Sequence, residues 1–275
     1  MKQWIIEGNV NPDARVRLFC VPYAGGGASI FHRWRNGNLR EAEICAVQMP
    51  GRESRISEDP LTSICRVVEE LGKVITSFRD LPFALFGHSN GALVCFELAR
   101  MLRRKYQMFP VSLIVSGQNA PDCPPLRPPI AQLPEKEFLQ SIKRLNGVPQ
   151  DIEFNKEVLE LLLPTLRADI HMSESYRYVP EEPLDCPILA IYGTEDPETS
   201  YDSMLAWQRQ TQRDLRAESI VGDHFFLNSR RRELLKVLSC YLKNLPVDPR
   251  PRIAPTCSTL PTSSFKQNSG TEFLS

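Results

Sequence analysis

The segment Gly87-His88-Ser89-Asn90-Gly91 constrains the fold of this chain more than any other segment. It follows an apolar run at residues 81–86 and leads into a helix-forming run at residues 92–100. A G-x-S-x-G segment between a strand and a helix forms a tight turn that exposes the serine hydroxyl at the carboxyl edge of a sheet. The helix N-terminus directs the Asn90 N–H toward negative charge that develops beside Ser89. The pattern predicts a nucleophilic Ser89; the alternative is an ordinary strand-to-helix turn.

Short apolar runs alternate with amphipathic segments along the chain. This alternation predicts crossover connections and a mostly parallel, doubly wound α/β sheet, with the active site beyond the carboxyl ends of the strands. The clearest helix is expected at residues 61–78, with Asp59 as N-cap and Pro60 as its first residue. The expected strands are 16–23, 43–49, 83–87, 111–117, 187–193 and 216–221, with a possible edge strand at 4–6.

One long interval interrupts the alternation. Residues 119–185 contain ten of the 23 prolines, no convincing strand, and helical patterns at 134–145 and 157–176. An insertion of this length predicts a helical lid over the site, the alternative being crossover helices packed on the sheet. We expect one domain at residues 1–245 that includes this lid. Residues 246–275, rich in proline, serine and threonine, are expected to form a disordered tail.

Composition argues against several classes of partner. Lys+Arg and Asp+Glu number 33 each, so no excess charge attracts nucleic acid or an anionic membrane surface. No apolar run approaches the ~20 residues of a membrane span, and the N-terminus lacks the apolar stretch of a signal peptide. The eight cysteines form no C-x-x-C pair, which favours free thiols in a reducing cytoplasm over disulfides or zinc. We expect a cytoplasmic monomer without metal or cofactor.

A nucleophilic serine needs a neighbouring base, and the chain offers four histidines. His88 adjoins Ser89, and adjacent residues on a tight turn point apart. His171 falls in the expected lid helix, and His32 follows a glycine-rich turn at the possible pocket entrance. His224 follows the last expected strand, and its loop opens at the same sheet edge as Ser89. We therefore predict His224 as the general base.

The carboxylate that orients His224 should also follow a strand end. Asp196 comes soon after an apolar strand, with Glu195 as its immediate rival and Asp223 as a weaker one. Asp196 would accept a hydrogen bond from His224 and fix its tautomer. The order Ser89, Asp196, His224 agrees with the chain order in α/β-hydrolases.

A second N–H donor is needed beside that of Asn90 to stabilise an oxyanion. The first expected strand ends in a glycine-rich run at residues 20–29, where the backbone can approach a bound acyl group closely. We assign the N–H of Ala24 as this donor. The run lacks both the G-x-G-x-x-G spacing and the Lys-Ser/Thr ending of phosphate-binding loops.

Taken together, these motifs resemble the type II thioesterases of modular polyketide and nonribosomal peptide synthetases, a group that includes the animal medium-chain fatty-acyl thioesterases. The resemblance implies an α/β-hydrolase fold with a helical lid and hydrolysis of acyl groups from the phosphopantetheine arm of carrier proteins. It also implies a Ser89–Asp196–His224 triad, with Ala24 and Asn90 as oxyanion donors. The segments that carry it, in the family's order, are 22–29, 49–55, 87–92, 193–197 and 222–227.

The resemblance leaves the role within this group open. We expect removal of aberrant acyl groups from a synthetase; the alternatives are a chain-terminating medium-chain thioesterase, a carboxylesterase and a non-catalytic carrier-binding module. The family usually has Met where this chain has Asn90, which places a polar side chain beside the acyl pocket. Candidates for contact with an acidic carrier protein or the pantetheine phosphate, unless they are merely solvated, are Arg33, Arg35, Arg52 and Arg55. Four apolar residues of the insertion could line an acyl channel, but their helical spacing favours ordinary core packing; they are Leu162, Leu163, Leu166 and Met172.

Overall fold

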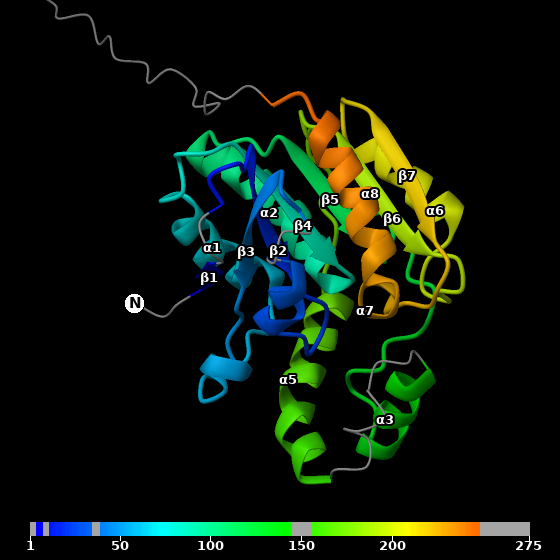
Figure 1. Cartoon of the computed structure of the whole chain (residues 1–275). Helices are drawn as coiled ribbons and strands as arrows, with labels where there is room; N and C mark the ends of the chain where they lie inside the picture. The colour runs from blue at the N-terminus through cyan, green and yellow to red at the C-terminus, as the bar shows by residue number, and fades with distance from the viewer. Residues whose placement is uncertain (1–3, 8–10, 35–38, 145–155, 248–275) are drawn as a thin grey trace, which may run out of the picture.

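A seven-stranded sheet forms the centre of the computed structural model (Figure 1). The structure describes residues 4–7, 11–34, 39–144 and 156–247. The strands are β1 (Ile5–Glu7), β2 (Val16–Val21), β3 (Ala42–Val47), β4 (Phe83–His88), β5 (Ser112–Ser116), β6 (Ile188–Gly193) and β7 (Leu215–Ile220). Their order is β1-β3-β2-β4-β5-β6-β7, and β1 alone runs antiparallel to its neighbour. Every predicted strand, including the edge strand, is confirmed to within two residues at each end.

Helices cover both faces of the sheet, as the doubly wound prediction requires (Figure 1). Successive side chains of a strand point to opposite faces, so Phe19 packs in one layer and Leu18 in the other. The strands β4, β5 and β6 are almost entirely buried and read as nearly continuous apolar runs, which explains why the sequence revealed them. One layer holds α1 (Ile64–Ile75), α2 (Asn90–Tyr106), α6 (Tyr201–Leu205) and η3 (Ala206–Gln210); the other holds η1 (Ala28–Trp34), α7 (Phe226–Ser229) and α8 (Arg231–Asn244).

Helix α1 is shorter than predicted. It begins at Ile64 with Ser63 as N-cap, so the assignment of Asp59 and Pro60 to the helix start is wrong. Leu61 and Phe78 pack against the same core from outside the helix, which made the apolar spacing look longer.

The predicted helical insertion lies between β5 and β6. Its helices α3 (Glu135–Arg144) and α5 (Lys156–Glu174) extend beyond one end of the sheet (Figure 1). They share a small core of their own, in which the Arg167 guanidinium lies 4.2 Å from the Phe138 ring centre. No strand occurs in the described part of this insertion, and its action as a lid stays a prediction.

Two of the predictions concern residues that the structure does not describe. The predicted tail beyond Val247 lies outside the described residues, and so does Arg35. Within the described ranges, no helix combines the length and the hydrophobicity needed to cross a membrane.

Candidate active site

Ser89 occupies a strained turn between β4 and α2. Its φ of 54° and ψ of −127° lie in a region that residues with a side chain rarely adopt. The Ser89 N–H donates to the Ser116 carbonyl at 2.8 Å, and the Ser89 carbonyl accepts from the Ala92 N–H at 2.8 Å. Such conformations persist only where surrounding structure holds them, and they cluster at functional sites. The structure therefore places Ser89 where the G-x-S-x-G pattern predicts it.

The two glycines of the turn allow close backbone contacts. A Cβ atom on Gly87 would lie 2.2 Å from the Gly91 carbonyl oxygen, and one on Gly91 would lie 2.5 Å from the Pro22 carbonyl oxygen. Both clashes involve backbone atoms, so neither is relieved by rotating a side chain. The glycines thereby set the distance between β2, β4 and the start of α2.

Replacing Gly91 by alanine should lower the free energy of unfolding by about 1–3 kcal/mol, the usual cost of overpacking a core. Urea unfolding monitored by circular dichroism measures this change. Gly72→Ala is the matched control, because the atom nearest its added Cβ is the mobile methyl of Met101. Equal losses in the two variants would contradict the steric role of Gly91.

Asp196 and His224 form a hydrogen-bonded pair at neighbouring strand ends. His224 Nδ1 lies 2.8 Å from Asp196 Oδ2, and the Asp196 carboxylate also accepts from the Glu198 N–H and the Thr199 hydroxyl. Burial raises the pKa of Asp196, but these hydrogen bonds and the electrostatic attraction to the His224 ring outweigh it and lower the pKa from its usual value of 3.8. Of the rival carboxylates, Glu195 is exposed and Asp223 accepts from the Phe225 N–H.

One cavity of about 520 Å³ brings the predicted groups together. Ser89, His224, Ala24 and Asn90 all line it, with Asp196 hydrogen-bonded to His224. Asn90 is the first residue of α2, so its N–H has no carbonyl partner one turn back in the helix. The residues predicted as nucleophile, base and oxyanion donors therefore line one cavity.

None of the four candidate acyl-channel residues of the insertion lines this cavity, which favours the core packing that the sequence also predicted. Leu163 and Leu166 pack against the core of α3 and α5. Met172 is 1% exposed and belongs to the core between the sheet and the layer of α1 and α2. The segment of α5 that reaches the cavity is its carboxyl end, at Ile170, Ser173 and Glu174.

His88 has a supporting position that sequence reasoning missed. Its ring is fully buried, with Nε2 2.8 Å from the His224 carbonyl oxygen and Nδ1 2.8 Å from the Ser116 hydroxyl. A carbonyl only accepts, so Nε2 carries the proton and Nδ1 accepts from Ser116. His88 thus holds the backbone of the loop that carries His224. No sequence signal marks this contact, because the two residues are 136 positions apart.

Burial lowers the pKa of His88 from 6.5 to about 3. Between these values the unfolded chain binds a proton at this residue and the folded chain does not. The contribution of His88 to the free energy of unfolding is therefore fully present above pH 6.5. It falls as the pH drops toward 3, by at most about 1.4 kcal/mol per pH unit. Urea unfolding at pH 7, 6 and 5 should show this slope, and His88→Gln should reduce it. An unchanged slope in His88→Gln would contradict the assignment.

The proposed carrier contacts through Arg52 and Arg55 are wrong, since both side chains are buried in the protein. Arg52 makes a two-point ion pair with Asp169 of α5, at 2.5 and 2.9 Å. Arg55 pairs with Glu58 at 2.8 Å and lies over the Trp4 ring. These arginines hold the loop after β3 in place.

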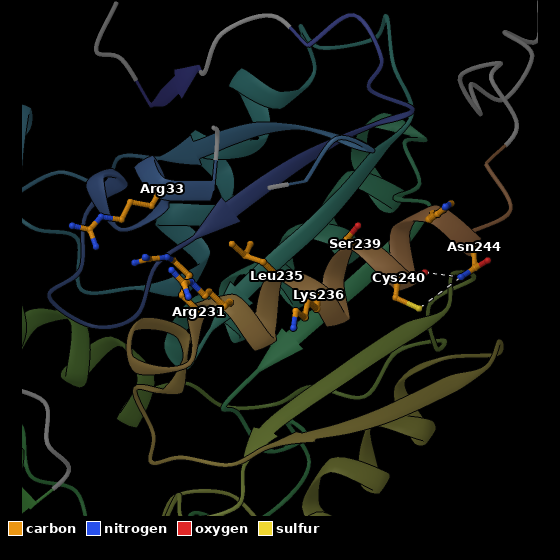
Figure 2. A pocket seen from close by; sticks show the side chains of 9 residues that line it. Arg33, Arg231, Leu235, Lys236, Ser239, Cys240 and Asn244 are labelled. Carbon is orange, nitrogen blue, oxygen red and sulfur yellow. Dashed lines mark hydrogen bonds between the residues drawn. The ribbon is translucent and has the colours of Figure 1, made fainter. Parts of the chain in front are cut away.

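Arg33 is exposed and lines a basic groove of about 950 Å³ with side chains of α8 (Figure 2). Every charged residue that lines this groove is positive; the set is Arg33, Arg231, Arg232, Lys236 and Lys243. The groove can accommodate an acidic surface or a phosphate group.

Comparisons with known proteins agree with the fold. The chain matches the thioesterase domain family over residues 16–241. The gramicidin S biosynthesis protein GrsT of Aneurinibacillus migulanus is 42% identical over 243 residues, which cover 88% of this chain and 95% of GrsT. The medium-chain S-acyl fatty acid synthase thioesterase of Rattus norvegicus is 30% identical over 224 residues, 79% of this chain and 83% of that protein.

Among solved structures, the type II thioesterase BorB from the borrelidin biosynthetic cluster superposes with a TM-score of 0.78 at 32% identity. The superposition covers 87% of this chain and 97% of BorB. The predicted resemblance is therefore confirmed, and the chain belongs to the thioesterase domain family.

Proposed function

We propose that this chain hydrolyses acyl thioesters on the phosphopantetheine arm of carrier proteins and removes aberrant acyl groups from a polyketide or nonribosomal peptide synthetase. The observation that carries the proposal is the His224–Asp196 pair at 2.8 Å, with His224 lining the same cavity as the strained Ser89. Relatives that act in such pathways, GrsT and BorB among them, support the choice of substrate class.

The proposed reaction proceeds through an acyl-enzyme. Asp196 accepts from Nδ1–H of His224, which leaves Nε2 free to take the proton of Ser89 as its oxygen attacks the thioester carbonyl. The N–H groups of Ala24 and Asn90 stabilise the tetrahedral oxyanion, where one such donor is typically worth about 2.7–4 kcal/mol. The pantetheine thiol leaves with the proton from His224. Water, activated by His224, then releases the acid and restores Ser89.

Hydrolysis of acyl-loaded carrier protein, compared with the same acyl-CoA over acetyl to dodecanoyl chains, tests this function. We expect broad cleavage that favours short, carrier-bound acyl groups. A sharp optimum at medium chains would instead indicate a chain-terminating enzyme. No hydrolysis of any substrate would contradict the proposal and favour a non-catalytic carrier-binding module.

The basic groove supports docking of an acidic carrier protein. Its positive side chains come from η1 and α8 (Figure 2). Helix α8 begins at Arg231, soon after His224 in the chain. Complementary charge mainly accelerates encounter and selects partners, so its loss should act on binding rather than on chemistry.

Reversing two exposed groove charges with Arg232→Glu and Lys236→Glu should raise KM for acyl-carrier protein about tenfold at low salt, as expected when opposite charges become like charges. The kcat for an uncharged acyl-N-acetylcysteamine should stay unchanged. Lys73→Glu, on α1 in the other layer, is the control. An equal KM for acyl-carrier protein in wild type and the double variant would contradict docking at this groove.

A further inference from the structure

Two buried amide oxygens beside the cavity accept no hydrogen bond. Among the residues that the structure describes, the buried side-chain N and O atoms without a partner are Asn90 Oδ1, Asn119 Oδ1 and Trp34 Nε1. Both asparagines line the cavity that contains Ser89, and Asn90 is only 4% exposed. Buried polar atoms are nearly always paired, so an unpaired one calls for a physical reason. Both oxygens belong to residues that line one cavity, so a bound ligand with hydrogen-bond donors can satisfy them.

The two asparagines come from neighbouring strand ends. Asn90 directly follows Ser89 at the end of β4, and Asn119 lies on the loop after β5, which pairs with β4. The Asn119 amide nitrogen donates to the Glu198 carbonyl at 3.0 Å, which identifies the unpaired atom as the oxygen. The Glu198 N–H donates in turn to Asp196, so the loop that carries Asp196 also holds Asn119.

Other charged groups at the cavity already have partners within the protein. Arg127 pairs with Glu174 and Glu198, and Glu174 also accepts from the N–H groups of Ile130 and Ala131. Among the described residues that line the cavity, the buried side-chain atoms without a partner are therefore two neutral acceptors. A hydroxyl or amino group satisfies such acceptors, whereas a plain alkyl chain leaves them unpaired.

We infer that Asn90 and Asn119 select acyl groups that carry a hydroxyl or amino group on the carbon next to the thioester carbonyl. This inference rests on the proposed function. Because Asn90 adjoins the nucleophile, a donor that meets its side chain lies close to the acyl carbonyl. The terminal torsion of asparagine has a broad range, which lets each amide turn its oxygen toward an entering donor. A site built to bind such a donor discriminates strongly against the analogue that lacks it.

Three pantetheine thioesters of one carbon skeleton test the inference: 4-methylpentanoyl, 2-hydroxy-4-methylpentanoyl and leucyl. We expect kcat/KM to be at least about tenfold higher for the two substrates with a donor. Asn119→Leu and Asn90→Leu should each move this ratio toward one, and both keep the backbone N–H at their position. The ratio is insensitive to partial unfolding, which lowers all three rates together. Asn11→Leu should leave the ratio unchanged, because the Asn11 amide donates to the carbonyls of Arg40 and Ala42 at the start of β3.

Calorimetric binding of the same thioesters to Ser89→Ala protein separates the inference from the proposed function. Tighter binding of the two donor-bearing thioesters, lost in Asn119→Leu, would support the polar subsite even without turnover in wild type. Equal kcat/KM and equal binding for all three thioesters would overturn it while leaving thioester hydrolysis intact. A preference that persists in both asparagine variants would also overturn it.

Discussion

Ser89→Ala should lower kcat for acyl-carrier protein hydrolysis by about 10⁴- to 10⁶-fold, since removing the nucleophile of a triad abolishes the covalent route. The Ala24 and Asn90 N–H groups remain, so the residual rate should still exceed that of water alone. Release of the carrier thiol, followed with a chromogenic disulfide, measures the effect.

His224→Ala provides a matched comparison for this variant. If the two residues act as a unit, the double variant should be no slower than either single one. Circular dichroism and thermal unfolding would establish that both proteins remain folded. A Ser89→Ala rate within tenfold of wild type would contradict the nucleophile assignment.

Arg52→Met should lower the free energy of unfolding by about 3–5 kcal/mol, because it leaves the buried carboxylate of Asp169 without its partner. Asp169 is 0% exposed and Arg52 is 2% exposed, so solvent cannot replace the lost contact. Asp169 also accepts from the Gly25 N–H at 2.7 Å, and Arg52 donates to the Gly26 carbonyl. Activity should fall as well, since this network holds the loop next to Ala24.

A double-mutant cycle distinguishes a buried charge from a local packing defect. Replacing both partners, with Arg52→Met and Asp169→Leu, should recover much of the lost stability, because no isolated charge remains. Lys73→Met, which removes an exposed ion pair with Glu70, should have a much smaller effect. Additive losses in the double variant would contradict the account of this pair.

The strand ends explain why so much of the site could be predicted. Ser89 and Asp196 follow the apolar strands β4 and β6, His224 follows the more polar β7, and parallel strands bring their carboxyl ends to one sheet edge. The structure places Asp196 beside His224, and Ser89 and His224 at one cavity. Local sequence order, together with topology, was therefore sufficient for these three positions.

Contacts between distant segments were beyond the reach of sequence patterns. Arg52 looked like a surface arginine because its partner, Asp169, lies 117 positions away on α5. His88 was set aside because it points away from Ser89, yet that direction brings it to the His224 backbone. Helix ends were also misjudged, since Leu61 and Phe78 bury apolar area without being helical.

The most direct test of the account is acetate release from acetyl-loaded carrier protein before and after treatment with a fluorophosphonate, with the adduct located by peptide mass spectrometry. The account predicts one adduct, on Ser89, and loss of hydrolysis in proportion to its formation. Continued hydrolysis by protein fully labelled at Ser89, or full inhibition by an adduct on another residue, would contradict it.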